Sequence, residues 1–237
     1  MSALSFIQKS LGFQDVFNNF LVQKSLLGIR KLRPSKDIRD PITFPMLIKM
    51  LDSIDKLFDD IYNISLLKCM FILGFRAFLR ISEMTFESRS KYPNHCLNLS
   101  NIQISQQNNS IEITFHSFKH KADDKPFRLV IKGDKTRYCP VGLLAHYLNN
   151  RQYKQGPLFL LQSGVPVDRK FFNSKLMQVI QFCGYNKDNF HIRSHSFRIG
   201  AATHAIQNGY SYEQVEVMGR WNSPAFKRYI RINSFTN

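Results

Sequence analysis

The stretch SHSFRIGAATHAIQNGYSYEQVEVMGRWNSPAFKRYIR (194–231) carries the clearest local folding signals in the chain. Apolar residues recur at helical spacing over SFRIGAATHAIQ, and Gly209 follows where a glycine commonly ends a helix. Ser211, with a glutamine three residues later, forms a capping-box pattern that opens a second helix, YEQVEVMG. Ser223 followed by Pro224 is typical of an N-cap and first helical position, and predicts a short third helix, AFKRYIRI.

Upstream of this stretch, the spacing of the apolar residues changes from helical to alternating. SIEITFHSF (110–118) predicts a half-buried strand, a shorter strand around LSNIQIS (99–105) precedes it, and FRLVIKG (127–133) predicts a third. Helices are expected over FPMLIKMLDSIDKLF (44–58) with Thr43 as its N-cap, ISLLKCMFILGFRAFL (64–79), PVGLLAHYLNN (140–150) and FFNSKLMQVIQFCG (171–184). The predicted fold is mainly α with a small antiparallel β-sheet, an α+β class.

The first part of the chain differs from the rest in pattern. Residues 1–32 carry helical apolar spacing in short pieces, and Asp15 is placed to cap a helix over residues 16–32. The polar segment RPSKDIRDP, with a proline near each end, is typical of a linker. We therefore expect an N-terminal helical segment over 1–32, a linker over 33–42 and one substantial domain over 43–237.

The chain is strongly basic. Its 237 residues include 33 Lys and Arg against 17 Asp and Glu, a formal net charge of +16 with a pI near 9.9. Because the charge is spread along the chain, it predicts attraction to a polyanion, most often nucleic acid. The alternatives are a solubilising surface or a basic localisation tail. The apolar content of 43% predicts a packed core.

The cysteines and the apolar runs exclude other classes of protein. The four cysteines are widely separated and form no CxxC pair, so the sequence predicts neither a zinc site nor a secreted disulfide framework. Reduced thiols are expected, in the nucleus if the protein is eukaryotic and otherwise in the cytoplasm. The longest apolar run, SLLKCMFILGFRAFL, is interrupted by Lys68 and Arg76, which predicts a buried helix and no association with a membrane.

Polar side chains in two segments have the types that phosphoryl chemistry uses. His195 and Arg198 are three residues apart and share a face at the start of a helix, and Tyr229 lies on the last short helix. Arg80 and Glu83 have the same spacing after the long apolar run. A phenol can attack a phosphodiester whose oxygens are held by guanidinium groups. The alternatives are a surface tyrosine among solvated basic residues and a structural Arg–Glu pair.

In chain order, these motifs resemble those of one family. LRISE (79–83), a β-hairpin, HSFR (195–198), GRW (219–221) and a tyrosine eight residues later are similar to the catalytic domain of tyrosine recombinases of the phage-integrase type. That family's pattern is Arg, Lys, His-x-x-Arg, His or Trp, and Tyr. The resemblance covers about residues 36–231 and implies the fold of that catalytic domain. HSFRIGAAT and MGRW also resemble recombinases of eukaryotic mobile elements, the Crypton and DIRS-like groups.

The resemblance implies a set of catalytic residues: Arg80, Lys119, His195, Arg198, Trp221 and Tyr229. It implies that the tyrosine attacks a DNA phosphate and forms a 3′-phosphotyrosyl intermediate, without a metal or another cofactor. The two arginines would hold the phosphate and Glu83 would orient the first of them. The histidine would accept the phenol proton, and the lysine would protonate the leaving 5′-oxygen. The tryptophan would donate one hydrogen bond and pack the tyrosine segment.

The lysine of the hairpin has more than one candidate. SFKHKADDKPF offers Lys119, which directly follows the strand and is preferred, Lys121, which is a close competitor, and Lys125. His191 and His204 are expected to be structural. Phosphate contacts that position DNA without reading its sequence are expected from Lys31, Arg33, Lys121, Arg193, Lys227 and Arg228.

The resemblance also sets expectations about the extent of the chain and its partners. Residues 1–32 resemble the closing helices of the family's N-terminal core-binding, SAM-like domain, which would need several more helices upstream. We therefore expect a fragment or a truncated form. The expected partner is double-stranded DNA, bound by a homo-oligomer, a tetramer. The segment from Ile230 to Asn237 is short for the C-terminal helix that this family often exchanges between protomers.

Two other functions stay open at this point. A truncated, non-catalytic relative would bind DNA without cutting it, and the absence of most of an N-terminal domain favours this alternative. A type IB topoisomerase uses a similar Arg/Lys/Arg/His/Tyr set and would relax supercoiled DNA without strand exchange.

Overall fold

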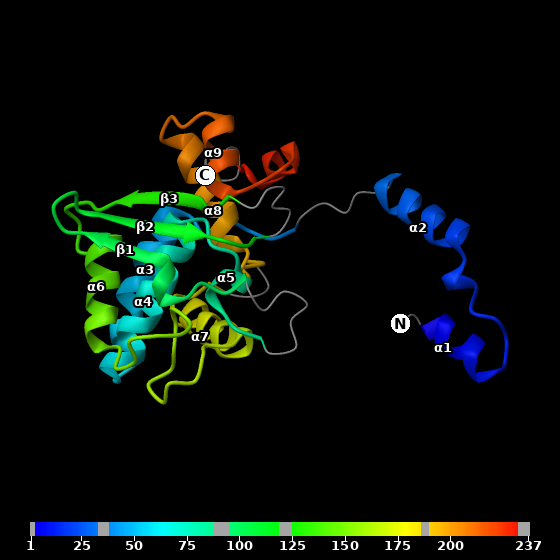
Figure 1. Cartoon of the computed structure of the whole chain (residues 1–237), viewed down its shortest axis with the longest axis horizontal. Helices are drawn as coiled ribbons and strands as arrows, with labels where there is room; N and C mark the ends of the chain where they lie inside the picture. Colours follow the sequence, from blue (N-terminus) through cyan, green and yellow to red (C-terminus); the bar gives the residue numbers. More distant parts are fainter. Residues whose placement is uncertain (1–2, 33–37, 88–94, 119–124, 186–189, 232–237) are drawn as a thin grey trace. The chain divides into compact units, whose positions relative to one another are not determined.

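The computed structural model describes residues 3–32, 38–87, 95–118, 125–185 and 190–231, apart from the side chains of residues 30, 31, 224 and 225. The chain divides into two compact units, Met1–Ile38 and Arg39–Asn237, and each is described by itself (Figure 1). The identity of the first unit as the remnant of a core-binding domain stays a prediction.

The first unit consists of α1 (Ala3–Ser10), the 3-10 turn η1 (Val16–Asn18) and α2 (Phe20–Leu32). The prediction of one helix over residues 16–32 with Asp15 as its cap is wrong at its start. Asp15 caps η1 instead, accepting a hydrogen bond from the amide of Phe17 at 3.0 Å. The backbone of Asn19 is extended, and its side chain accepts from the amide of Leu21 at 2.9 Å. Asn19 therefore interrupts the helix because it competes for the backbone amides as a local cap.

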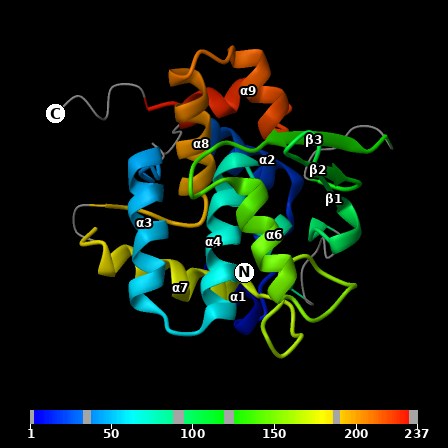
Figure 2. The ribbon, with the colours of Figure 1, turned by 90° about the vertical axis from the view of Figure 1, so that its left-hand side faces the viewer.

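The second unit is built around α4. Its long helices are α3 (Phe44–Leu57), α4 (Ile61–Arg76), α6 (Pro140–Asn150), α7 (Arg169–Phe182) and α8 (Ser196–Gln207). Thr43 caps α3 as predicted, accepting from the amide of Met46 at 3.3 Å. Helix α4 is apolar around most of its circumference and packs against α3, α6 and α8 (Figure 2). A helix that is apolar on all sides is stable only when other elements cover it, so α4 lies at the centre of the core.

The sheet has three antiparallel strands, as the alternating pattern predicts. They are β1 (Ile102–Ser105), β2 (Ser110–Phe115) and β3 (Phe127–Lys132), in the spatial order β1-β2-β3. On the central strand, Ile113 is opposite Ile102 on one side and Leu129 on the other. Ile111, Ile113 and Phe115 are buried, and the sheet packs against α6 through β2 and β3. The fold class predicted from the sequence is confirmed.

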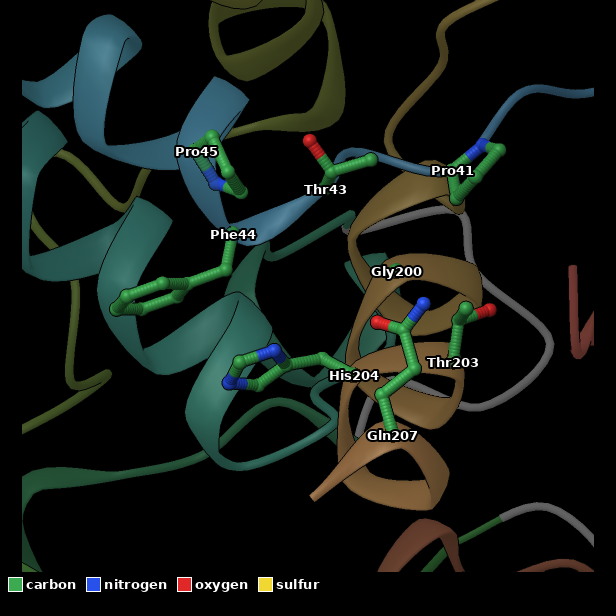
Figure 3. Close-up of a pocket in the computed structure, with 8 residues that line it drawn as sticks. All are labelled: Pro41, Thr43, Phe44, Pro45, Gly200, Thr203, His204 and Gln207. Carbon is green, nitrogen blue, oxygen red and sulfur yellow. The ribbon is translucent and has the colours of Figure 1, made fainter. Parts of the chain in front are cut away.

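Helix α8 lies directly against the segment that enters α3. A Cβ on Gly200 would lie 1.8 Å from the carbonyl oxygen of Ile42, so only glycine permits this approach. Beside this contact is a cavity of about 310 Å³ between the start of α3 and α8. Figure 3 shows the ring of His204 facing that of Phe44, with ring centroids 4.8 Å apart. Burial, with the charge of Arg76 nearby, lowers the pKa of His204. The structural role expected of His204 stays a prediction.

Candidate active site

A second cavity, of about 720 Å³, brings most of the predicted catalytic residues together. It is lined by Arg80, Ile81, Ser82, His195, Arg198, Arg220, Trp221, Asn222, Ser223 and Tyr229. Five of the six predicted catalytic side chains are in this set, although more than a hundred residues of sequence separate the first from the others. Lys119 and its competitor Lys121 lie outside the described residues, so the identity of the hairpin lysine stays a prediction.

The start of α8 supplies two of these groups. His195 occupies the N-cap position, and its ring meets that of Tyr229 edge to face with centroids 5.0 Å apart. Arg198 lies one turn further and is only 1% exposed, although it reaches the cavity wall. Its two terminal nitrogens donate to the carbonyls of Phe78 and of Gly219, the latter at 2.8 Å. These bonds fix the plane of the guanidinium, which also lies 4.5 Å above the centre of the Trp221 ring.

Arg80 approaches the cavity from the turn between α4 and α5 (Ile81–Met84), where it is the N-cap residue. Its side chain is 16% exposed, so it is the more accessible of the two arginines. Its Nη1 donates to Oε1 of Glu83 at 3.0 Å, and its Nη2 donates to the carbonyl of Arg220 at 2.8 Å. Arg80 and Glu83 are thus paired, and both terminal nitrogens of Arg80 are held.

Glu83 is the acidic centre of a group of arginines. Its carboxylate is 1% exposed. One oxygen binds the side chain of Arg80, and the other binds Arg220 at 2.7 Å and accepts from the backbone amide of Arg80 at 2.8 Å. Burial raises the pKa of Glu83, but the charges of Arg220, Arg80 and Arg198 outweigh burial, so the pKa lies below its ordinary value. Burial and the charge of Arg80 lower the pKa of Arg198, which remains protonated at neutral pH as arginines do.

Trp221 and Tyr229 pack together at the end of the second unit, after α9 (Tyr212–Gly219). Their ring centroids are 5.9 Å apart, and the Trp221 ring is stacked on that of Phe226 at 5.3 Å. The predicted α-helix over this segment is a 3-10 helix, η4 (Pro224–Tyr229), and Ser223 makes no side-chain cap bond. A tighter 3-10 turn is common in short segments, and here stacking of Phe226 on Trp221 holds η4 in place.

Thr203 fastens the tyrosine segment to α8. Its hydroxyl lies 3.1 Å from the carbonyl oxygen of Tyr229 and 2.9 Å from that of Ile199, and it accepts a bond from the amide of Arg231 at 3.2 Å. Thr203 is 4% exposed. Because α8 also carries His195 at its start, a single helix positions the histidine ring and the backbone around Tyr229.

Replacing Thr203 with Val is expected to loosen the tyrosine segment. Valine keeps the shape of threonine but removes the hydroxyl that lies between the carbonyls of Ile199 and Tyr229 and accepts from the Arg231 amide. The loss should cost about 1 kcal/mol in the free energy of unfolding. Trypsin should cut after Lys227 and Arg228 faster than in the wild-type protein, as followed by mass spectrometry. Thr203→Ser retains the hydroxyl and is the matched control. Equal cutting of the two variants would contradict this role of the hydroxyl.

Among the residues that the predicted set did not contain, Gly219 and Arg220 make the contacts that support the catalytic side chains, and both stand in the phrase MGRW. Gly219 accepts from Arg198 through its carbonyl, and a Cβ on it would lie 1.7 Å from Cζ3 of Trp221. Arg220 binds Glu83 from the following position. In the sequence, the only hint of these two roles is that a glycine and an arginine stand directly before the lone tryptophan. The packing in the structure explains why those residue types are there.

The predicted phosphate-contacting residues are only partly described. Arg193, Lys227 and Arg228 are exposed, and the last two directly precede Tyr229 in η4. They do not line the cavity. The side chain of Lys31 and the whole of Arg33 and Lys121 lie outside the described part of the chain.

Three further observations concern potential metal ligands, cysteines and apolar helices in the described part of the chain. Within it, no group of three or more His, Cys, Asp or Glu side chains could hold a metal ion. All four cysteines are free, two of them buried. No helix among the described residues has the length and apolar character that crossing a membrane requires.

The fold is that of tyrosine recombinase catalytic domains. The XerA recombinase has a TM-score of 0.60 at 16% identity, over 98% of this chain and 69% of that one. The XerH site-specific recombinase, solved in a post-cleavage complex with palindromic difH substrate, has a TM-score of 0.57 at 19% identity, over 81% of this chain and 50% of that one. The Tn1549 transposon integrase, solved with transposon right end DNA, has a TM-score of 0.54 at 15% identity, over 82% of this chain and 62% of that one.

In sequence, the chain is similar to the tyrosine recombinase XerC of Rickettsia canadensis (strain McKiel). The two are 27% identical in an alignment of 113 residues that covers 44% of this chain and 36% of that protein. No family model matches the sequence. The similarity to XerC and the shared fold support a relationship to tyrosine recombinases and integrases. The chain spans only about a third of XerC and half of the XerH chain.

Proposed function

We propose that this protein cleaves and rejoins DNA strands through a 3′-phosphotyrosyl intermediate, as a site-specific recombinase or integrase. The observation that carries the proposal is the convergence of Arg80, His195, Arg198, Trp221 and Tyr229 on one cavity. These are the side-chain types, in the chain order, of the tyrosine recombinase pattern, and they lie on a fold shared with recombinases that were solved with DNA. Fold alone does not assign a function, so the proposal depends on the site.

The chemistry is a transesterification. The phenol oxygen of Tyr229 attacks a backbone phosphorus, the bond from phosphorus to the 5′-oxygen breaks, and the 3′-phosphate becomes esterified to the tyrosine. His195, whose ring meets that of Tyr229, accepts the phenol proton. The hairpin lysine, Lys119 in our prediction, protonates the leaving 5′-oxygen. Reversal with another 5′-hydroxyl rejoins the strand, and the phosphotyrosyl ester retains the energy, so neither ATP nor a metal is required.

The arginines supply the electrostatic part of catalysis. The transition state places extra negative charge on the non-bridging phosphate oxygens, and preorganised cations stabilise that charge. Arg80 and Arg198 are held in fixed orientations by their bonds to Glu83 and to backbone carbonyls, so they need no reorganisation when charge develops. Each terminal nitrogen carries two N–H groups, which leaves donors for a phosphate.

The finer assignment is to a mobile element. HSFRIGAAT, MGRW and the tryptophan at the fifth catalytic position support a recombinase of the Crypton or DIRS-like kind. Double-stranded DNA is the proposed substrate, and several copies are proposed to assemble on it. The nucleus is the proposed location if the source is eukaryotic.

The proposal is tested by trapping the covalent intermediate. The protein is incubated with a library of randomised DNA duplexes that carry nicks, so that cleavage near a nick releases a short fragment and prevents rejoining. DNA that remains attached to the protein in detergent is recovered and sequenced. We expect an adduct enriched in one sequence. Binding of DNA with no adduct across the library would favour the non-catalytic alternative.

Binding is expected to weaken steeply with salt, because the +16 net charge makes phosphate neutralisation a main source of affinity. Arg228→Gln should reduce the slope of log affinity against log salt by about 1, since one phosphate contact is lost. Fluorescence anisotropy from 50 to 300 mM salt measures the slope. Lys154→Gln, on the exposed loop after α6, is the control and should leave the slope unchanged. Equal slopes for the two variants would remove Arg228 from the phosphate contacts.

A further inference from the structure

Arg220 lines the candidate active site, but the recombinase pattern gives it no role. Its side chain is 0% exposed, and its backbone is in the left-handed region with φ 54° and ψ 49°. A non-glycine residue in this conformation is uncommon, and a buried guanidinium is costly unless it is paired. A left-handed backbone and a buried guanidinium both cost free energy, so they are expected to persist only where contacts with the surrounding structure offset that cost.

The side chain of Arg220 joins three parts of the site. It donates to Oε2 of Glu83 at 2.7 Å and to the carbonyl of Phe78 at 3.2 Å, and it lies 3.9 Å above the ring of Phe115 on β2. The other oxygen of Glu83 binds Arg80. A carboxylate held on one side by a buried arginine is therefore presented to Arg80 on the other.

The backbone of Arg220 also contacts Arg80, directly and without Glu83. Its carbonyl oxygen accepts a hydrogen bond from Nη2 of Arg80 at 2.8 Å. The left-handed conformation at this position sets the direction of the chain after α9 and thereby of this carbonyl. The two terminal nitrogens of Arg80 are thus held by Arg220, one through Glu83 and the other directly.

We propose that Arg220 is a positioning residue, which fixes the guanidinium of Arg80 at the cavity and keeps the Glu83 carboxylate from neutralising it. This inference rests on the proposed function. Arg80, Arg220 and Glu83 together carry a net charge of +1, and Arg198 raises the total to +2. Without Arg220, Glu83 would cancel Arg80, and only the charge of Arg198 would face a phosphate.

The first measurement is a double-mutant cycle with Arg220→Met and Arg80→Ala. Single-turnover cleavage by Arg220→Met should be at least about tenfold slower than by the wild type. Because Arg220 acts through Arg80, Arg220→Met should have less than about a twofold effect in the Arg80→Ala background. Effects that multiply independently would overturn the inference. Thermal unfolding checks that each variant is folded, and Arg220→Lys, which keeps the charge but loses the planar fork, carries the test if Arg220→Met does not fold.

The same cycle is measured on DNA affinity, which does not require cleavage. If the wild type forms no adduct, the proposed function fails, but coupled losses of affinity for the two substitutions would still support the positioning role. Independent losses, or no loss from either substitution, would overturn it.

The second measurement is the pH dependence of cleavage. Glu83 faces Arg80 at the start of α5, Arg198 on α8, Arg220 after α9 and His95 before η3 (Leu99–Asn101). The arginines hold the pKa of Glu83 below its ordinary value against the effect of burial, so the carboxylate stays ionised as the pH falls. Removing Arg220 raises that pKa. Below it, the protonated Glu83 no longer cancels the charge of Arg80, so the deficit in cleavage rate of Arg220→Met relative to the wild type should shrink as the pH falls. A deficit of the same size at every pH would indicate a merely structural loss and overturn the inference.

Discussion

Tyr229→Phe is expected to bind DNA with wild-type affinity and to form no covalent adduct. Phenylalanine preserves the ring contacts with His195 and Trp221, whose centroids lie 5.0 and 5.9 Å away, so the segment should keep its place. Only the attacking oxygen is lost, and removing a nucleophile lowers the rate by more than about 1,000-fold. The measurement is the fraction of labelled nicked duplex that migrates with the protein on a denaturing gel.

Tyr210→Phe is the matched control for this variant. Tyr210 is 46% exposed in the turn before α9, and the same single oxygen is removed. We expect this control to form the adduct at the wild-type rate. An adduct that survives Tyr229→Phe but disappears in another tyrosine variant would show that the nucleophile has been assigned to the wrong residue.

Gly219→Ala should disable the site by displacing Trp221. The added Cβ would lie 1.7 Å from Cζ3 and 2.0 Å from Cε3 of the ring, which is too close for any rotamer adjustment of a flexible side chain to absorb. The guanidinium of Arg198 lies over the Trp221 ring, and the Trp221 ring stacks on Phe226. Movement of the Trp221 ring would therefore disturb both Arg198 and the segment that contains Tyr229. Overpacking of this kind costs about 1–3 kcal/mol in the free energy of unfolding.

The single tryptophan of the chain makes this effect directly visible. Its fluorescence should change in the folded variant, the midpoint of urea unfolding should fall, and cleavage should be lost. Gly142→Ala on α6 is the control, since the nearest atom to its added Cβ is 3.9 Å away. That variant should be neutral or more stable by up to about 1 kcal/mol, because alanine favours a helix over glycine. Wild-type emission and stability in Gly219→Ala would contradict the packing described for Trp221.

Much of the fold was predictable because local chemistry and tertiary packing agree. The strands β2 (Ser110–Phe115) and β3 (Phe127–Lys132) follow from alternation, although they end before the predicted segments 110–118 and 127–133 do. The helix over 140–150 begins at a proline and has the predicted bounds. Ser211 forms the capping box that its spacing predicts. Where packing overrides local preference, the prediction is wrong. The Ser223-Pro224 pair opens a 3-10 helix, and Phe226 within that helix stacks on Trp221, a contact that the local sequence does not reveal.

The sequence indicates five of the residues that line the candidate site, and Glu83 beside Arg80, but it does not indicate the supporting roles of Arg220 and Thr203. The order of Arg80, His195, Arg198 and Tyr229 is visible in the chain, because reactive side chains have recognisable types and spacing. The role of Arg220 depends on its left-handed backbone conformation and on its bond to the Glu83 carboxylate, 137 residues earlier. No local sequence pattern reveals either feature. The role of Thr203 is equally hidden from local patterns, because its hydroxyl contacts the backbone of Tyr229, 26 residues later.

The bond between Arg80 and the carbonyl of Arg220 joins residues that are 140 positions apart. During translation at about 5–20 residues per second, the first partner leaves the ribosome at least several seconds before the second. The nucleophile follows nine residues after Arg220. A nascent chain therefore exposes basic residues before Arg80 is fixed and before Tyr229 has been synthesised. Under the proposed function, the order of synthesis prevents DNA cleavage until the catalytic unit is complete.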